Sequence, residues 1–199
     1  GVKSRTQTLH FARMNGLNHS VTTVAGSGNM GITAIVPVVA FSQIKNISRE
    51  KTLRAISLSL LITIHIKSKM GVLTPACGCA IAAGVGTGAA LAYLMSGTDG
   101  EIFSAIKTMI GGLAGMICDG AKGGCAVKLS VAVGTAFDAA ALALKGISIP
   151  GLDGIVDTDV ERSIENLSYL TRVGMRNIDD SIINIMTDIP DYLDQNFPN

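Results

Sequence analysis

Four cysteines are the residues best suited to chemistry in this chain of 199 residues. Cys77 and Cys79 form a C-x-C pair, and Cys118 and Cys125 are joined by the run CDGAKGGC. Clustered thiols outside a small, cysteine-dense scaffold indicate metal binding or redox chemistry. Since the spacings match neither common zinc ribbons nor ferredoxins, burial as small apolar residues stays open as the alternative. We expect thiolates from separate helix ends to converge on zinc or on an iron–sulfur cluster.

A glycine-rich loop, AGSGNMG at residues 25–31, is the second candidate site. Ser27, Gly28 and Asn29 offer a hydroxyl group, an amide and free backbone N–H groups directly before an apolar stretch. A helix start of this kind binds anions and carboxylates. The competing interpretation is a plain glycine turn in which Ser27 only caps the helix.

The three histidines carry weaker signals. His10 and His19 lie in the polar opening segment, and His65 lies inside an apolar helix. We expect His65 to be a satisfied core or interface residue rather than a catalytic one. Nothing in the sequence requires His19 to approach the glycine-rich loop.

Helix start and stop signals surround both candidate sites. Ser48 as an N-cap, Glu50 in the first turn and Gly71 just past the end predict one complete helix. Apolar stretches predict further helices over residues 32–44, 76–96, 101–118 and 125–146, with Pro37 kinking the first or marking its first turn. Residues 1–29 are polar and mixed and end in the glycine-rich loop.

The predicted fold is all-α, with Gly/Ala-rich central helices buried on most sides. The charged, amphipathic C-terminal part predicts two surface helices. We therefore expect residues 1–199 to form a single all-α domain in which residues 150–199 are an outer helical appendage.

The Gly/Ala-rich segment 76–96 is long enough to span a bilayer, so a membrane span must be weighed against a core helix. It is poor in Leu, Ile and Phe, and the chain has no Trp to form an interfacial belt. We therefore expect a buried helix and no membrane partner, despite a mean hydropathy of +0.44. A net charge of +1 without a polybasic run argues against a nucleic-acid partner. We see no signal peptide and expect a cytoplasmic protein.

Three motifs together resemble a known family. AGSGNMGITAIVPV, CGCAIAAGVGTGAALAYLMSG and MICDGAKGGCAVK resemble, in order and spacing, the serine dehydratase-like α-chain family of iron–sulfur L-serine dehydratases and L-cysteine desulfidases. The short CDGAKGGC run is most similar to the desulfidase branch. The resemblance implies a four-iron–four-sulfur cluster held by three cysteines, with one iron free of protein ligands. Cys118 and Cys125 match two ligands, and the third falls on Cys77, with Cys79 as the alternative.

The resemblance also implies an activity. Ser27, Gly28 and Asn29 match the family's region for the substrate carboxylate, and the implied reaction is β-elimination on L-serine or L-cysteine. The products would be pyruvate, ammonia and water or sulfide, without pyridoxal phosphate. The chain resembles the C-terminal, cluster-bearing part of the family, so the catalytic proton acceptor is expected in a preceding N-terminal domain.

Several points stay open at this stage. The sequence does not choose between serine and cysteine, or say whether this part is active alone. Apolar helices with little charge suggest a homo-oligomer. An aerobic preparation is expected to lose an exposed cluster and keep free thiols. The alternatives are a non-catalytic relative of the family and a small Gly/Ala-rich membrane subunit.

Overall fold

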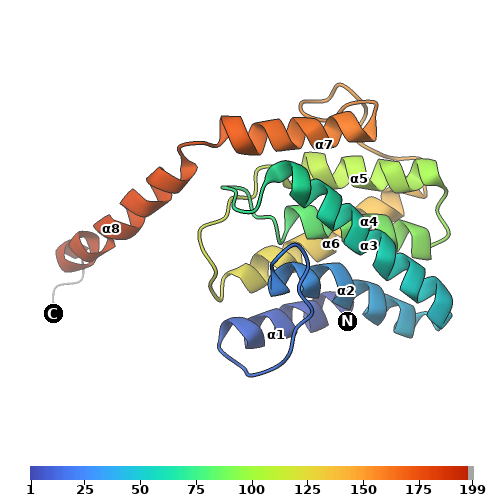
Figure 1. The fold of residues 1–199 in the computed structure, drawn as a ribbon, viewed down its shortest axis with the longest axis horizontal. Helices are drawn as coiled ribbons and strands as arrows, with labels where there is room; N and C mark the ends of the chain where they lie inside the picture. The colour runs from blue at the N-terminus through green and yellow to red at the C-terminus, as the bar shows by residue number, and fades with distance from the viewer. Residues whose placement is uncertain (197–199) are drawn as a thin grey trace.

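The computed structural model describes residues 1–196, with side chains described as far as residue 187. The described part consists of helices and loops with isolated β-bridges and no strand, which confirms the all-α prediction. The last three residues of the predicted appendage, 197–199, lie outside the described residues. The elements are α1 (Val2–Met14), α2 (Gly28–Ile44), α3 (Arg49–Met70), α4 (Ile81–Leu94), α5 (Asp99–Leu113), α6 (Cys125–Ala143), α7 (Val160–Tyr169), the π-helical turn η1 (Leu170–Gly174) and α8 (Ile178–Asn196) (Figure 1).

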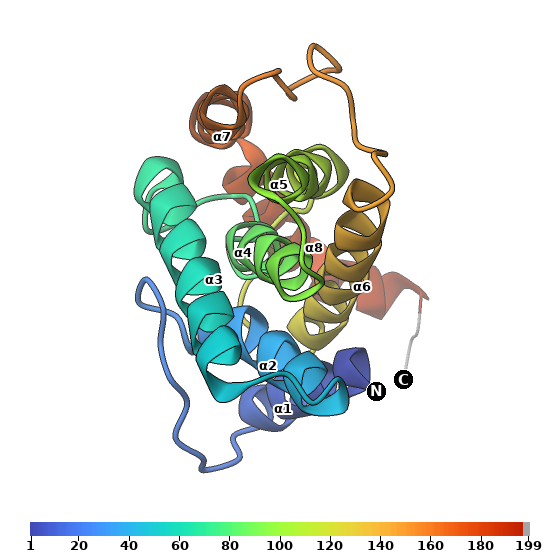
Figure 2. The same cartoon turned by 90° about the vertical axis from the view of Figure 1, so that its right-hand side faces the viewer.

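Helix α4 is the centre of the bundle, enclosed by α2, α3, α5 and α6 (Figure 2). Its small residues make this possible, because they let neighbouring backbones come close. A Cβ added to Gly86 would lie 2.4 Å from the Ser59 carbonyl oxygen of α3, and one added to Gly88 would lie 2.9 Å from Met109 Cγ of α5. Every residue of α4 except Tyr93 is buried. The Gly/Ala-rich segment is therefore a core helix in this fold, as the sequence predicted.

Pro37 lies inside α2 rather than in its first turn. A proline in a helix interior leaves the carbonyl group four residues earlier without its usual N–H partner. Here that carbonyl belongs to Thr33, and the Thr87 hydroxyl of α4 donates a hydrogen bond to it at 2.7 Å. The contact replaces the missing partner inside the core and fixes α2 against α4.

The predicted boundaries of α3 are confirmed. The Ser48 hydroxyl accepts a hydrogen bond from the Lys51 N–H, and Gly71 follows the last turn with a φ of 96°, a conformation that favours glycine. The helix predicted to reach Cys118 ends instead at Leu113. Residues 116–118 leave the helix and pair with residues 75–77 through an antiparallel bridge.

Helix α1 was missed by the sequence analysis, which left residues 1–29 as a polar opening. The residues that α1 buries are Val2, Thr6 and His10, and two of these three are polar. Apolar periodicity therefore could not find this helix. It packs against α2 and α6.

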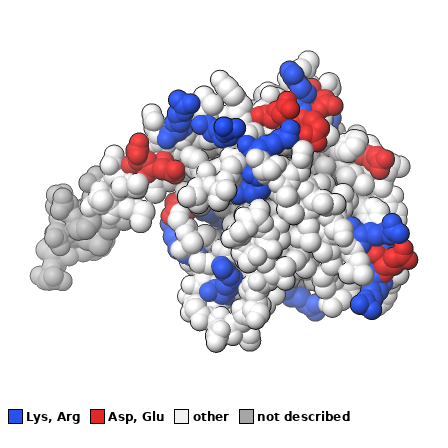
Figure 3. Space-filling model, viewed as in Figure 1, with Lys and Arg blue, Asp and Glu red and all other residues white. Residues whose placement is uncertain are grey.

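The two predicted C-terminal helices are present. Helix α7 packs against α3 and α5, and α8 extends away from the bundle (Figure 1). On the face drawn in Figure 3, basic and acidic side chains are mixed over α7 and near the start of α3. Of the described helices, only α6 is long and apolar enough to cross a bilayer, and half of its most apolar window is buried inside the fold. One such half-buried helix is weak support for a membrane span.

Candidate functional site

Two loops bring the cysteine pairs together. The Cys77 N–H donates to the Met116 carbonyl oxygen at 2.8 Å, and the Cys118 N–H donates to the Pro75 carbonyl oxygen at 2.6 Å. These bonds flank the bridge between Ala76 and Ile117. The loop before α4 and the loop after α5 are thus tied to each other at the positions of the thiols.

The CGC run and Cys125 also lie at helix starts. The carbonyl oxygen of Cys77 accepts hydrogen bonds from the Ala80 and Ile81 N–H groups, so the CGC run leads directly into α4. Cys125 is the first residue of α6, and its thiol donates to the Gly120 carbonyl oxygen at 3.4 Å within the CDGAKGGC turn. The thiol of Cys125 therefore turns back toward the loop that carries Cys118.

The four thiols share one electrostatic environment. Burial raises the pKa of Cys77 to about 12, and the charges of Cys79 and Cys118 add to that effect. Burial also raises the pKa of Cys79, where the charges of Cys118 and Cys125 contribute. Such mutual repulsion requires the thiols to be close, and a bound cation would relieve it. All four are free cysteines.

Two lysines provide positive charge beside these thiols. Lys67 of α3 is only 6% exposed, and its Nζ lies 3.2 Å from the position that a Cβ of Gly78 would take. Burial lowers the pKa of Lys67, while the thiolate charges of Cys79, Cys118 and Cys77 act against this. A side chain at position 78 would crowd the end of the lysine, which would have to shift by a few tenths of an ångström. Lys128 of α6 donates to the Ile117 carbonyl oxygen at 3.0 Å.

Asp119, in the loop between Cys118 and Cys125, pairs with one lysine of the same loop and with one lysine of α6. Its carboxylate pairs with Lys122 at 2.6 Å and also with Lys128. Hydrogen bonds from these two lysines lower the pKa of Asp119 to about 2, so the carboxylate stays charged. The turn between Cys118 and Cys125 is therefore held by its own ion pairs.

The glycine-rich loop adjoins the cysteines. Ser27 is the N-cap of α2, and its hydroxyl accepts a hydrogen bond from the Met30 N–H at 3.3 Å. The same hydroxyl lies 3.5 Å from the Cys79 thiol. The N-terminal ends of α2, α4 and α6 therefore meet at one end of the bundle (Figure 1). Partial positive charge from three helix starts favours anions there.

The remaining predicted loop residues lie in the first turn of α2. Gly28 and Asn29 are both buried, and the Asn29 side-chain oxygen accepts a hydrogen bond from Arg13 Nη1 at 2.5 Å. Sequence reasoning missed Arg13, because α1 was not predicted, and missed Lys67, because a lysine near a helix end is usually solvated.

His65 and His19 take no part in the contacts around the cysteines and the Ser27 loop. His65 Nε2 lies 2.8 Å from the Glu161 carboxylate across the contact between α3 and α7, and is half-exposed. His19 is exposed in the loop before α2.

The donor set consists of thiols, which are the ligands of iron–sulfur clusters and of many zinc sites. Among the described residues, no three His, Cys, Asp or Glu side chains are close enough together to hold one ion. A four-iron cluster binds each thiolate to a different iron, so it spaces its ligands more widely. Free thiols beside two lysines and several helix starts are compatible with such a group.

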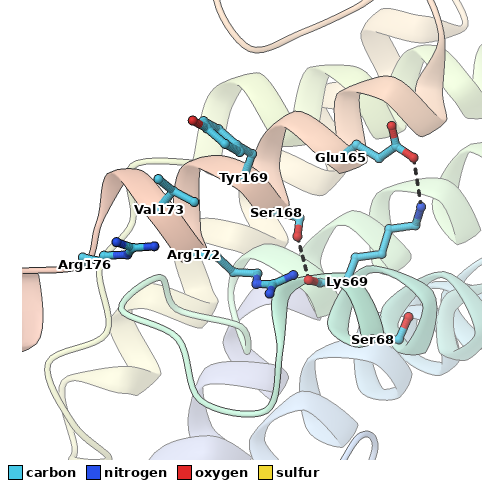
Figure 4. A pocket seen from close by; sticks show the side chains of 8 residues that line it. All are labelled: Ser68, Lys69, Glu165, Ser168, Tyr169, Arg172, Val173 and Arg176. Carbon is cyan, nitrogen blue, oxygen red and sulfur yellow. Dashed lines mark hydrogen bonds and ion pairs between the residues drawn. The ribbon is translucent and has the colours of Figure 1, made fainter.

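A separate pocket lies between the end of α3 and the α7–η1 segment (Figure 4). Lys69 pairs there with Glu165 at 3.4 Å, and its carbonyl oxygen accepts a hydrogen bond from the Ser168 hydroxyl at 2.6 Å. Arg172 and Arg176 line the same pocket. No cysteine lines it, so it is not part of the thiol site.

Residues 3–184 match the family described as serine dehydratase alpha chain, and this chain belongs to that family. It is 49% identical over 177 residues to a UPF0597 protein of Clostridium tetani, covering 89% of this chain and 42% of the relative. It is 46% identical over 184 residues to one of Caldanaerobacter subterraneus subsp. tengcongensis, covering 92% of this chain and 44% of the relative. The chain therefore spans less than half the length of these relatives. No solved structure matches it.

Proposed function

We propose that this chain is the cluster-bearing part of an iron–sulfur-dependent lyase that acts on L-serine or L-cysteine. The observation that carries the proposal is the pairing of the two cysteine-bearing loops through backbone hydrogen bonds, beside Ser27 and near the N-terminal ends of three helices. The family supports a dehydratase-type β-elimination. The similar relatives carry names that state no activity, so the reaction itself is inference.

The proposed cluster ligands are Cys118, Cys125 and one thiol of the CGC run. Sequence resemblance favours Cys77. One contact favours Cys79, because its thiol adjoins the Ser27 hydroxyl at 3.5 Å. The charges of both Cys118 and Cys125 also raise the pKa of Cys79. Cys77 is buried, and among the cysteines only the charges of Cys79 and Cys118 influence its pKa. When bound, a four-iron cluster with one iron free of protein ligands would supply Lewis acidity to the leaving hydroxyl or thiol group.

The chain's own residues would bind and orient the substrate. The free N–H groups of the α2 start, with Ser27, Gly28 and Asn29, suit the α-carboxylate. Lys67 and Lys128 would balance the negative charge of the thiolates. Loss of the α-proton and the β-substituent releases water or sulfide, and hydrolysis of the remaining enamine gives pyruvate and ammonia. Pyridoxal phosphate is not part of the proposal.

Part of the machinery is proposed to lie outside this chain. The alpha-chain family description and the relatives' greater length support a companion chain or an N-terminal domain, which would supply the proton acceptor. We further propose a cytoplasmic homo-oligomer, in line with the apolar side chains that α8 exposes at Ile183, Ile185 and Met186.

The test is turnover by the intact protein after anaerobic reconstitution with iron and sulfide. Pyruvate released from L-serine and from L-cysteine is measured separately, with sulfide as a second product from cysteine. We expect pyruvate from at least one of the two and none from the Cys118→Ala variant. A fully iron-loaded protein that releases pyruvate from neither amino acid would instead be a non-catalytic relative of the family.

A further inference from the structure

Arg13 lies against the start of α2, on the side where Ser27, Gly28 and Asn29 begin the helix. Arg13 Nη1 donates a hydrogen bond to Asn29 Oδ1 at 2.5 Å. A Cβ added to Gly28 would lie 2.9 Å from Arg13 Nε and 3.0 Å from Nη2. The absence of a side chain at Gly28 therefore leaves the space in which the guanidinium group lies.

This position places a guanidinium group beside the partial positive charge of a helix start. The start of a helix carries partial positive charge, so a guanidinium group there is repelled rather than stabilised. Within the described side chains, no carboxylate lies within ion-pair distance of Arg13. Two positive groups facing the same point are typical of an anion-binding site.

His10 is a second and independent sign of an incomplete polar site. It lies one turn before Arg13 on α1 and is completely buried, yet neither of its ring nitrogens has a hydrogen-bond partner. The Asn29 side chain lies near enough to the imidazole to raise its pKa, although neither nitrogen makes a regular hydrogen bond, and the charge of Arg13 lowers that pKa. Buried polar atoms without partners are rare in native proteins, and they indicate a missing ligand or water.

The neighbouring amide is poorly satisfied as well. Asn29 is 6% exposed, and its Nδ2 group donates to the Met14 sulfur at 3.2 Å. Thioether sulfur is a weak acceptor. Arg13 itself is exposed, so its remaining N–H donors are accessible from solvent.

We propose that Arg13 binds the α-carboxylate of the amino-acid substrate, together with the N–H groups that begin α2. The proposal rests on the proposed function and adds a residue to its site. A carboxylate held here adjoins Ser27, whose hydroxyl is 3.5 Å from the Cys79 thiol. The β-substituent of a short amino acid would then point toward the cysteines. Asn29 is a positioning residue, because it fixes the guanidinium group through its side-chain oxygen.

The kinetic test compares Arg13→Gln and Arg13→Lys with Arg5→Gln in the intact, reconstituted protein. Arg5 is an arginine of the same helix whose guanidinium group bonds Gln43 at 3.3 Å, so it is the matched control. For Arg13→Gln we expect KM for L-serine or L-cysteine to rise about 10- to 100-fold, since charge-assisted hydrogen bonds are lost in the ground and transition states alike. Arg13→Lys should fall between the wild type and Arg13→Gln, and Arg5→Gln should match the wild type.

A binding measurement without turnover separates this proposal from the reaction itself. L-Alanine carries the carboxylate but no leaving group, and L-alaninamide lacks the charge of the carboxylate. By calorimetry, the wild type should bind L-alanine at least about tenfold more tightly than L-alaninamide, and Arg13→Gln should lose that preference. Retained helical circular dichroism would show that the variants fold.

The outcomes distinguish the two claims. An Arg13-dependent preference for L-alanine in a protein that releases no pyruvate supports the carboxylate site and refutes the proposed reaction. Unchanged KM and unchanged L-alanine binding in a folded Arg13→Gln variant refute the carboxylate site while the lyase activity stands. Absence of any preference for L-alanine in the wild type also refutes it.

Discussion

Because His10 is buried, we expect the free energy of unfolding to fall in mild acid. Burial lowers the pKa of its imidazole from 6.5 to about 4, and the nearby charge of Arg13 adds to the effect, while the Asn29 side chain opposes it. The unfolded chain therefore binds a proton at higher pH than the folded protein does. Between these two pKa values, acid favours the unfolded state.

The sign and size of this loss follow from the linkage between proton binding and folding. The stabilisation from a neutral His10 is complete above about pH 6.5, declines as the pH falls toward 4, and levels off below that. A shift of about 2.5 pKa units corresponds to roughly 3 kcal/mol at most. Between about pH 7.5 and pH 5, the expected loss in the free energy of unfolding is about 2 kcal/mol.

Urea unfolding at the two pH values measures this loss, in the wild type and in His10→Leu. Leucine cannot titrate, so the variant should lose about 2 kcal/mol less than the wild type over the same interval, whatever its stability at neutral pH. His19→Asn, at an exposed loop position, is the control and should behave as the wild type. Equal pH dependence in the wild type and His10→Leu would show that His10 is not held neutral in the folded protein.

Two further predictions concern the cysteines and the core. If the CGC ligand is Cys79, Cys79→Ala should lose most of the reconstituted iron while Cys77→Ala keeps it; the reverse result would assign Cys77. Gly86→Ala should destabilise the protein by about 1–3 kcal/mol, because the added methyl group would lie 2.4 Å from the Ser59 carbonyl oxygen. Thermal unfolding measures this loss. The control is Gly100→Ala, whose added Cβ would have its nearest neighbour 3.9 Å away and which should be neutral or stabilising. Equal losses for both variants would contradict the close packing of α3 on α4.

Sequence patterns predicted the parts of this fold that depend on local chemistry. The boundaries of α3 follow from Ser48 and Gly71, and the burial of α4 follows from its small residues and the missing interfacial aromatics. Both are short-range signals. The end of α5 at Leu113 was not predicted, because the following residues leave the helix to pair with a loop more than thirty positions earlier.

The candidate site was predicted only in its most reactive residues. The cysteines and the Ser27 loop were evident from their types and spacing. Arg13 and His10 were not, because α1 buries polar rather than apolar side chains and its contact with α2 is purely tertiary. The burial of Lys67 likewise depends on Gly78, which lies in a different element.

Iron and sulfide content tests the central claim most directly, namely that the two cysteine pairs together hold an iron–sulfur cluster. The intact protein, reconstituted without oxygen and freed of unbound iron, should contain about four irons and four sulfides per chain. Cys118→Ala and Cys125→Ala should each lose most of both. Full iron and sulfide content in both variants, or none in the wild type, would contradict the account.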